Sequence, residues 1–302
     1  MFSTLRTTCA LTVTTLALGA TPLAAQDYSR VEIVAIPIEA GIFMLTGEGG
    51  NIGVSVGEDG VFMIDDQFAP LSEKITAVLK GLSDQPVSYL LNTHWHFDHT
   101  GGNENFGAAG AVIVAHDNVR ERMSTDQFIE AFGRAVPAAP DIALPVVTFS
   151  DEVSFHFNGD TIDVVHVAAA HTDGDSLVHF ENANVLHTGD TFFNGFFPFI
   201  DTSSGGSLAG MIAAVERALE LVDDDTTIMP GHGPVATRID LLRYRDMLVE
   251  VRDTVAPLVE GGATREEVVA RNPLGALGPS WGAGFLDTMT FTGIVYDSLS
   301  AG

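Results

Sequence analysis

The stretch His94-Trp95-His96-Phe97-Asp98-His99 places three imidazoles and one carboxylate within six residues, directly after the apolar segment 87–91. Histidine is the commonest metal ligand among side chains, and carboxylates bind zinc as well. On a loop, His94 and His96 can project to one side while Asp98 and His99 reach a second point nearby. The motif therefore predicts a strand that runs into a loop binding two metal ions.

Three further ligand side chains follow strand-like runs elsewhere in the chain. They are His171 after residues 161–167, Asp190 after residues 184–187, and His232 after residues 226–229. The last lies in Pro230-Gly231-His232-Gly233, where glycine lets the backbone approach a site closely. We therefore expect four strand ends to contribute to one metal centre.

With these motifs in this order, the chain resembles the metallo-β-lactamase superfamily, whose pattern is HxHxDH, a lone histidine, an acidic or cysteine ligand, and a final histidine. The match runs from about residue 33 to residue 242. The resemblance implies an α/β fold, a four-layer αββα sandwich, and two zinc ions, with iron or manganese as alternatives. It implies that His94, His96 and His171 hold the first metal, that Asp98, His99 and His232 hold the second, and that Asp190 bridges both.

Asp190 stands where dinuclear members such as glyoxalase II have a bridging carboxylate, and where the lactamases best known from resistance have cysteine. The only cysteine of the chain is Cys9, near the N-terminus. In those lactamases a lysine that binds the substrate follows the cysteine closely, whereas residues 191–199 contain no basic residue. This departure argues against a simple antibiotic-resistance function.

Other polar residues near the strand ends are weaker candidates. His187 lies three residues before Asp190, so we consider it a partner that orients a ligand. Asp65 and Asp66 end the run 61–64 and are similar candidates, with a plain strand-end turn as the alternative. The other four histidines lie in or beside strand-like runs and are interpreted as structural: His116, His156, His166 and His179.

Residues 1–25 have the pattern of a secretory signal peptide. A single charge, Arg6, precedes an apolar and threonine-rich stretch, and small residues lead to a cleavage site near Ala25. A membrane anchor is the alternative, but the apolar stretch is short for a span of ~20 residues. We therefore expect residues 26–302 to form a single hydrolase domain in the periplasm or outside the cell, with no membrane contact after cleavage and without Cys9.

The chain is strongly acidic, with 14 Lys and Arg against 40 Asp and Glu and a formal net charge of −26. Nucleic-acid binding depends on neutralising phosphates with Lys and Arg. We therefore expect a small-molecule substrate and no nucleic-acid partner. Strong like charge keeps a protein dispersed in solution.

Hydrophobic periodicity predicts two similar halves separated by the proline-rich segment 136–145. Strands are expected over 31–36, 42–46, 52–56, 61–64, 87–91, 111–115, 146–149, 153–157, 161–167, 176–180, 184–187 and 226–229. Helices are expected over 71–82, 118–123, 126–134, 208–221, 239–255, 265–271 and near the C-terminus. The apolar residues Phe285, Leu286, Met289, Phe291, Ile294 and Val295 form either a core helix or a homodimer surface.

Five phenylalanines within residues 192–199 predict an apolar wall beside the metals, with core packing as the alternative for at least three of them. We predict that Phe192, Phe196 and Trp281 bind the substrate, and that Phe285 also reaches the pocket. The turn 46–51 is expected to close the other side. Glutathione thioesters are disfavoured, because the family's thioesterase uses basic residues for its anionic substrate.

A water held between two divalent ions loses its proton near neutral pH, so the expected activity is hydrolysis. We predict an exported dinuclear zinc hydrolase that acts on an ester, a lactone or an amide, β-lactams included, with Asp98 orienting the nucleophile. The alternatives are an iron-dependent oxidoreductase on the same fold, a phosphodiesterase, and a zinc-storage protein without catalysis.

Overall fold

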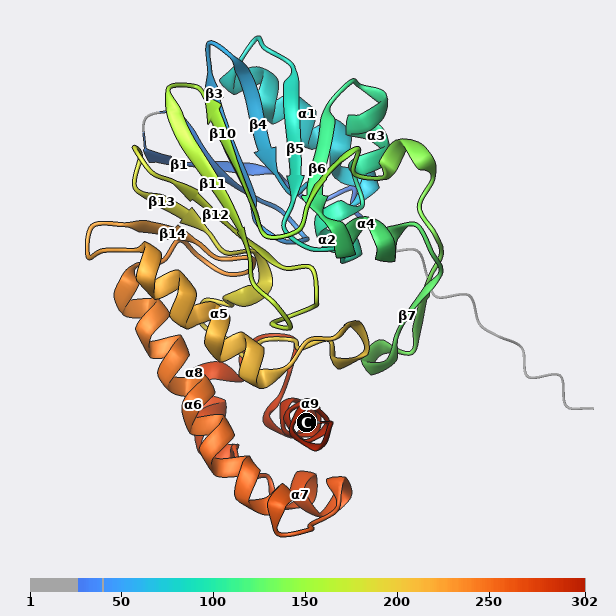
Figure 1. Cartoon of the computed structure of the whole chain (residues 1–302), viewed down its shortest axis with the longest axis vertical. Helices are drawn as coiled ribbons and strands as arrows, with labels where there is room; N and C mark the ends of the chain where they lie inside the picture. Colours follow the sequence, from blue (N-terminus) through green and yellow to red (C-terminus); the bar gives the residue numbers. More distant parts are fainter. Residues whose placement is uncertain (1–26, 40, 302) are drawn as a thin grey trace, which may run out of the picture.

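The computed structural model describes residues 27–39 and 41–301, in which two β-sheets face each other and helices cover the outer face of each sheet (Figure 1). The predicted signal peptide and Cys9 lie outside the described residues. Within the described residues, no helix combines the length and hydrophobicity that crossing a membrane would require.

The first sheet has seven strands in the order β1-β2-β3-β4-β5-β6-β9. Strands β1 to β4 pair antiparallel, whereas β4, β5, β6 and β9 pair parallel. Helices connect the parallel strands. The elements of this half are β1 (Val34–Glu39), β2 (Ile42–Thr46), β3 (Ile52–Gly57), β4 (Gly60–Ile64), α1 (Ser72–Leu82), β5 (Val87–Asn92), α2 (Phe97–Thr100), α3 (Asn103–Ala108), β6 (Val112–His116), α4 (Asp117–Met123) and β9 (Val147–Phe149).

The second sheet has five strands in the order β10-β11-β12-β13-β14. Its last pair, β13 and β14, is parallel, and α5 connects the two strands. The elements of this half are β10 (Glu152–Phe157), β11 (Asp160–His166), β12 (Ser176–Phe180), β13 (Val185–His187), α5 (Leu208–Leu221), β14 (Thr227–Met229), α6 (Arg238–Glu260), α7 (Arg265–Arg271), α8 (Gly278–Trp281) and α9 (Thr288–Ser300).

Alternating side chains on the strands produce the four layers. On β4, Phe62 and Ile64 point between the sheets, whereas Val61 and Met63 pack against α1 on the outer face. On β12 of the second sheet, Val178 points between the sheets and Leu177 packs against the helices of the C-terminal half. The predicted αββα sandwich is therefore confirmed.

Most predicted elements are confirmed to within three residues at each end, but the helix expected over 126–134 is wrong. This segment belongs to a hairpin of β7 (Gln127–Ile129) and β8 (Arg134–Val136), joined by a 3-10 turn over Glu130–Phe132. Gly133 ends that turn with φ 56°, a left-handed conformation that glycine adopts without steric cost. Pairing between the two short strands replaces the helix.

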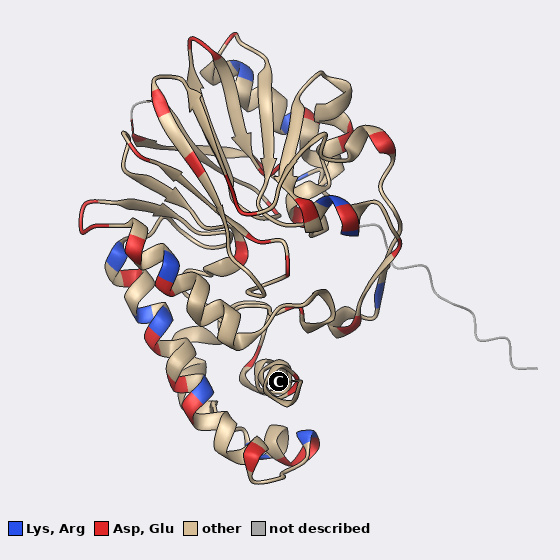
Figure 2. Ribbon diagram, viewed as in Figure 1, with Lys and Arg blue, Asp and Glu red and all other residues tan. Residues whose placement is uncertain are grey.

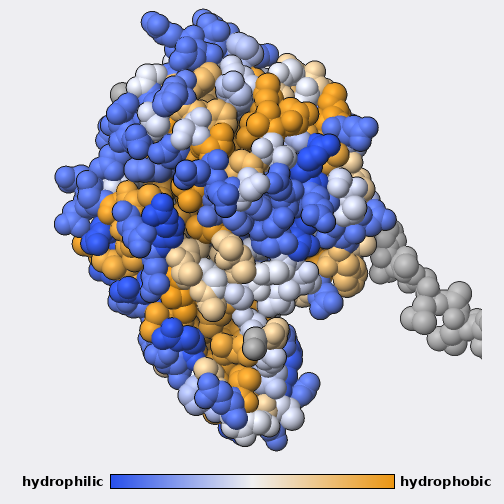
Figure 3. All heavy atoms as spheres, in the orientation of Figure 1, coloured by the Kyte–Doolittle hydropathy of each residue, from blue (hydrophilic) through white to orange (hydrophobic). Residues whose placement is uncertain are grey.

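The C-terminal apolar segment forms α9, which packs against α6 and α7. Phe291 and Val295 are fully buried there, which favours the core-helix alternative for these two residues. Phe285 and Met289 are about half exposed. Figure 3 shows apolar residues at the surface among the helices of the C-terminal part of the chain.

Charged groups are distributed unevenly over this framework. Acidic residues lie on loops, strands and helices of both halves, whereas many of the few basic residues lie on α6 (Figure 2). Lys74 on α1 has a structural role, because its Nζ donates to the carbonyls of Tyr28, Ser29 and Val31 at 2.9, 2.9 and 2.7 Å. These contacts attach the first described residues to the outer face of the first sheet.

Replacing Phe62 with alanine should lower the free energy of unfolding by about 3–5 kcal/mol. Phe62 has no exposed surface, and its ring centroid lies 5.0 Å from that of Phe155 across the space between the sheets. Urea denaturation of the purified protein measures the change. The matched control is Phe128→Ala on β7, where the side chain is 55% exposed. In this variant the free energy of unfolding should change by no more than about 0.5 kcal/mol. Equal losses in both variants would contradict this assignment of the core.

Candidate metal centre

The seven predicted ligands lie together at one edge of the sandwich, beyond the carboxyl ends of β5, β11, β13 and β14. Strand direction explains this convergence. In the second sheet, β11 and β13 are both antiparallel to β12 and therefore run parallel to each other, and β14 is parallel to β13. Their carboxyl ends consequently meet at the same edge, where side chains from distant parts of the sequence come into contact.

The first group consists of His94, His96 and His171. Nδ1 of His96 and Nε2 of His171 lie 2.8 Å apart, and the three ring planes are mutually inclined at 85°, 88° and 87°. Nε2 of His94 is buried and has no hydrogen-bond partner. Two nitrogens bound to one tetrahedral zinc at ~2.0–2.1 Å lie about 3.3 Å apart. The geometry and the orphaned nitrogen both fit a divalent metal ion.

The second group consists of Asp98, His99 and His232. The Nε2 atoms of His99 and His232 are 3.3 Å apart, and Oδ2 of Asp98 lies 3.3 Å from Nε2 of His232. The Asp98 and His232 side chains are 23% and 20% exposed, whereas His99 is fully buried. This group is therefore the one that opens towards solvent.

Asp190 lies between the two groups. Its Oδ1 is 3.1 Å from Nε2 of His99, and its Oδ2 is 3.5 Å from Nε2 of His171 and 3.3 Å from Nε2 of His232. One buried carboxylate thus reaches ligand atoms of both groups. This is the geometry expected of a residue that bridges two metals.

A second buried carboxylate, Asp65, fixes the orientation of two of these rings. Its Oδ2 lies 2.7 Å from Nδ1 of His99, and it accepts hydrogen bonds from the backbone N and Oγ1 of Thr93 at 2.8 and 2.7 Å. Oγ1 of Thr93 in turn lies 3.0 Å from Nδ1 of His94. Asp65 adopts a left-handed conformation with φ 61°, which aspartate tolerates better than most residues. The sequence named Asp65 as a candidate partner, and the structure gives it these contacts.

Two further imidazoles, those of His96 and His171, are oriented by the end of the phenylalanine-rich stretch and the residues directly after it. Nε2 of His96 lies 3.0 Å from Oδ2 of Asp201, and Nδ1 of His171 lies 2.8 Å from the carbonyl oxygen of Phe199. Sequence reasoning missed Asp201. The available signal was an acidic residue that follows an apolar run, as Asp190 follows the run 184–187.

The other two candidates, His187 and Asp66, form hydrogen bonds with backbone groups instead of with a ligand side chain. Nδ1 of His187 accepts a hydrogen bond from the amide of Gly189 at 3.1 Å, so His187 supports the turn that carries Asp190. Asp66 accepts a hydrogen bond from the amide of Gly102 at 2.8 Å, and burial raises the pKa of its carboxyl well above the usual value. Of the histidines interpreted as structural, His116 and His166 stack on each other, with ring centroids 3.7 Å apart.

Two glycines are required by close approach to the ligands. A Cβ at Gly50, in the predicted closing turn, would lie 2.0 Å from Cε1 of His99. A Cβ at Gly231 would lie 2.1 Å from Oδ1 of Asp190. Both distances are far shorter than van der Waals contact, so any side chain at these positions would displace a ligand.

Burial and neighbouring charges give the histidines different protonation states. Burial lowers the pKa of His94 well below its usual value and that of His171 to about 4, so both rings are neutral, the form that binds metals. Burial acts in the same direction on His232, but Asp190 and Asp98 outweigh it and raise its pKa to about 9. In the metal-free protein at neutral pH, His232 therefore carries a proton that a metal must displace.

A cavity of about 430 Å³, here called the metal pocket, opens beside both groups. Its lining includes His96, Asp98, His171, Asp190 and His232 on one side. The remaining lining is mostly aromatic and includes Phe68, Phe97, Phe132, Phe193, Phe196, Phe199 and Phe285. No lysine or arginine is among its described lining residues. The site therefore combines a cluster of metal ligands with an apolar, aromatic wall.

The predicted substrate-binding residues divide between this pocket and the core. Phe196 lines the metal pocket, and so does Phe285. Phe192 lies outside it, because its side chain is fully buried and packs against Tyr244. Successive residues in extended backbone point to opposite sides, so Phe193 faces the pocket in place of Phe192. Trp281 also lies outside the pocket and packs against Tyr244.

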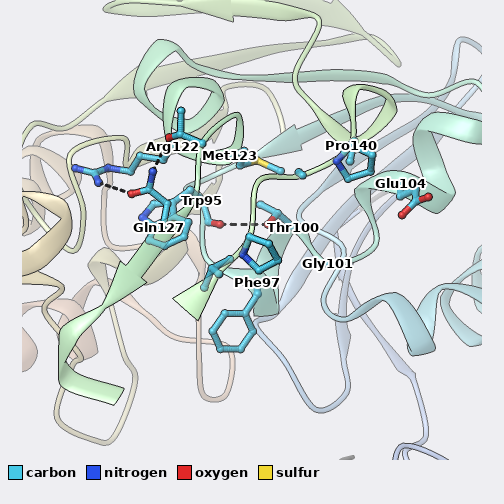
Figure 4. Close-up of a pocket in the computed structure, with 14 residues that line it drawn as sticks. Trp95, Phe97, Thr100, Gly101, Glu104, Arg122, Met123, Gln127 and Pro140 are labelled. Carbon is cyan, nitrogen blue, oxygen red and sulfur yellow. Dashed lines mark hydrogen bonds between the residues drawn. The ribbon is translucent and has the colours of Figure 1, made fainter. Parts of the chain in front are cut away.

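A second, smaller cavity of about 170 Å³ lies between the β7–β8 hairpin and the loop 93–96, here called the metal loop (Figure 4). Trp95, Phe97 and Thr100 line it from the metal loop and α2, and Arg122 and Gln127 line it from α4 and β7. Oγ1 of Thr100 donates to the carbonyl of Trp95 at 3.2 Å, and Nη1 of Arg122 donates to Oε1 of Gln127 at 3.2 Å. The first bond supports the loop that carries His94 and His96, and the second joins α4 to β7.

Comparison with known proteins agrees with this geometry. The sequence pattern of the metallo-beta-lactamase superfamily matches residues 45–232. A hydroxyacylglutathione hydrolase from Polaromonas sp. is 28% identical over 186 residues, which are 59% of this chain and 60% of that relative. The match thus spans less than two thirds of the relative's length.

Two solved structures share the fold. A metallo-beta-lactamase from Pontibacter korlensis superposes with a TM-score of 0.60 at 19% sequence identity, covering 72% of this chain and 99% of that one. A stereoselective inverting sec-alkylsulfatase from Pseudomonas sp. superposes with a TM-score of 0.67 at 16% identity, covering 88% of this chain and 50% of that one.

Replacing Asp65 with asparagine should weaken metal binding by the second group about 10–100-fold. Asparagine presents an amide NH2 where His99 Nδ1 needs an acceptor, which favours the tautomer whose Nε2 carries the proton. Competition with a chromophoric chelator measures the affinity. Asp224→Asn is the control, because that side chain is 90% exposed and precedes β14, at the end of the strand opposite to the metal centre. Unchanged affinity in Asp65→Asn would contradict the orienting role of Asp65.

Metal binding by the second group should release at least one proton per ion at pH 7. The pKa of His232 is raised above its unfolded value to about 9, so the proton is bound at pH 7 and is lost as pH rises through 9. Burial lowers the pKa of His99, but Asp190, Asp65 and Asp98 outweigh it and hold that pKa well above its usual value, so His99 also carries a proton. Affinity should therefore increase at least about tenfold per pH unit up to about pH 9. Titration calorimetry in buffers of different ionisation enthalpy counts the protons. Proton-independent binding of both ions would show that His232 is not displaced.

Proposed function

The chain belongs to the metallo-β-lactamase superfamily, and on that basis we propose that it is an exported dinuclear zinc hydrolase of an uncharged or weakly charged, apolar ester, lactone or amide. The observation that carries the proposal is the position of seven metal-ligand side chains beside an aromatic pocket whose described lining contains no Lys or Arg. Residues 26–302 are proposed to act as one domain in the periplasm or outside the cell, because residues 1–25 have the pattern of a signal peptide.

The donor set suits two divalent ions. His94, His96 and His171 would hold one ion, Asp98, His99 and His232 the other, and Asp190 both. When bound, such ions lower the pKa of water and polarise a substrate carbonyl. Imidazole and carboxylate ligands without thiolate suit zinc and also accommodate iron or manganese.

Among the chain's own residues, Asp98 is the proposed catalytic residue. Burial opposes its charged form, but His99 and His232 hold its pKa below the usual range, so its side chain is a carboxylate. It is also one of the ligands that line the metal pocket. Asp98 can therefore accept a hydrogen bond from an attacking water and orient it towards the substrate.

The pocket wall argues for the substrate class. Its volume of about 430 Å³ lies within the range of ~300–1,000 Å³ typical of small-molecule sites. Phenylalanines favour an apolar group beside the scissile bond, and the absence of Lys and Arg from the described lining disfavours a strongly anionic substrate such as a glutathione thioester. Several similar proteins are named as hydrolases of that thioester, so it is the first substrate class to test directly.

Three alternatives use the same ligands. Iron bound by these ligands would favour an oxidoreductase. The identity of the bound metal therefore distinguishes the oxidoreductase from the proposed zinc hydrolase. A phosphodiesterase is less consistent with the apolar lining and the formal net charge of −26. A zinc-storage role is disfavoured, because storage does not need the bridging position of Asp190 between two groups.

Purified mature protein should contain two zinc ions per chain, falling to about one in Asp190→Ala. Loss of the Asp190 carboxylate, which reaches both groups, removes a ligand from each. Elemental analysis measures the number of metal ions per chain. The control is Asp225→Ala, a variant at an exposed position.

Hydrolysis of p-nitrophenyl esters, lactones and a chromogenic cephalosporin should disappear with chelator, with Asp98→Ala and with Asp190→Ala. A single iron ion per chain would instead favour the oxidoreductase.

A further inference from the structure

A second large cavity adjoins the metal pocket. This distal cavity has a volume of about 560 Å³, and Phe132 lines both it and the metal pocket. Three chain segments each contribute neighbouring residues to the two cavities. Ile129, Phe199 and Phe285 line the metal pocket, and the residues that follow them, Glu130, Ile200 and Leu286, line the distal cavity. At each of these three places, a single chain segment therefore lines both cavities.

Phe132 is the residue at which the boundary between the two cavities can open. Its side chain is 49% exposed and its ring centroid lies 4.7 Å from that of Phe199, so it packs against the pocket wall without being enclosed. It belongs to the tip of the β7–β8 hairpin and is followed by Gly133 in the left-handed conformation. Rotation of a half-exposed ring about χ1 breaks little core packing.

The distal cavity has an apolar floor and an acidic rim. Ile200, Leu286 and Ile294 are 1%, 3% and 7% exposed and form the floor, and Met289 is 47% exposed beside them. The one basic residue among its described lining, Arg265, is paired with Asp297 at 2.8 Å. Glu130 adds a further carboxylate. Such a lining accepts an apolar chain and repels a chain that ends in a carboxylate.

We propose that the metal pocket and the distal cavity form one elongated site for a substrate with a linear, uncharged apolar chain. The hydrolysed bond lies at the metal ligands, and the chain passes Phe132 and ends over Met289. This inference rests on the proposed hydrolase function and names the substrate class within it. Compact substrates such as β-lactams occupy the metal pocket alone.

The first test is the rate constant kcat/KM for p-nitrophenyl esters of linear acyl chains from acetate to laurate. Each additional buried methylene should raise kcat/KM about fourfold, and the rise should continue beyond the chain length that fills the metal pocket. A rate that peaks at acetate or butyrate and falls with longer chains would overturn the inference while leaving the hydrolase function intact.

Met289→Glu tests the distal cavity directly. Met289 is the second residue of α9, where an acidic side chain is favourable beside the positive end of the helix, so the variant should fold. We expect kcat/KM for decanoate and laurate esters to fall at least about tenfold and that for acetate to change less than about twofold. The matched control is Ile239→Glu, because Ile239 is the second residue of α6, is 59% exposed and lines neither cavity.

A binding measurement separates failure of this inference from failure of the hydrolase function. Titration calorimetry with 1-butanol, 1-octanol and 1-decanol requires no turnover. Affinity that rises with chain length in the parent and in Ile239→Glu, but not in Met289→Glu, would support the elongated site even if no ester were hydrolysed. Affinity independent of chain length, or an equal loss in both variants, would overturn it.

Discussion

Removal of the ligand side chains from water is the constraint on which the rest of the structure depends. A buried imidazole or carboxylate needs a partner for each polar atom, because an unpaired one costs free energy. Asp65, Asp201 and the carbonyl of Phe199 supply partners for the outer nitrogens of His99, His96 and His171. The inner atoms are left facing one another, and Nε2 of His94 has no hydrogen-bond partner. A divalent cation satisfies them together, so the surrounding protein is arranged to need one.

The sandwich makes this burial achievable. Strands that run parallel within each sheet deliver their carboxyl ends to one edge, so each ligand is held on a loop anchored by a strand at its base. Close packing at this edge then restricts the residues that can occupy it. Gly50 and Gly231 leave room for His99 and Asp190, and Asp65 accepts an unfavourable backbone conformation in order to reach His99. Such strain persists only where the neighbouring contacts hold the residue in place.

The pocket wall follows from the same geometry. Residues 192–199 cross the edge in irregular, partly extended backbone, so their aromatic side chains divide between two environments. Phe193, Phe196 and Phe199 face the metal ligands, whereas Phe192 and Phe197 fill the core beneath the helices of the C-terminal half. The stretch therefore stabilises the helical layer and shapes the site. The hairpin that carries Phe132 and the segment that carries Phe285 complete the wall from other parts of the chain.

The sequence by itself determined the fold class, the metal ligands expected at the centre and most of the strands and helices. These features depend on local patterns, because alternating apolar residues define a strand face and ligand side chains cluster directly after strands. The sequence also named Asp65, Phe196 and Phe285 as candidates, but tertiary structure decided the other residues that orient the ligands and line the pocket. Asp201 contacts His96 across a separation of 105 residues, and Phe192 faces the core only because neighbouring side chains in extended backbone point to opposite sides. Residues 126–134 became a hairpin because strand pairing and the turn at Gly133 outweighed weak local helix propensity. Such outcomes depend on contacts between segments distant in sequence, which no local pattern records.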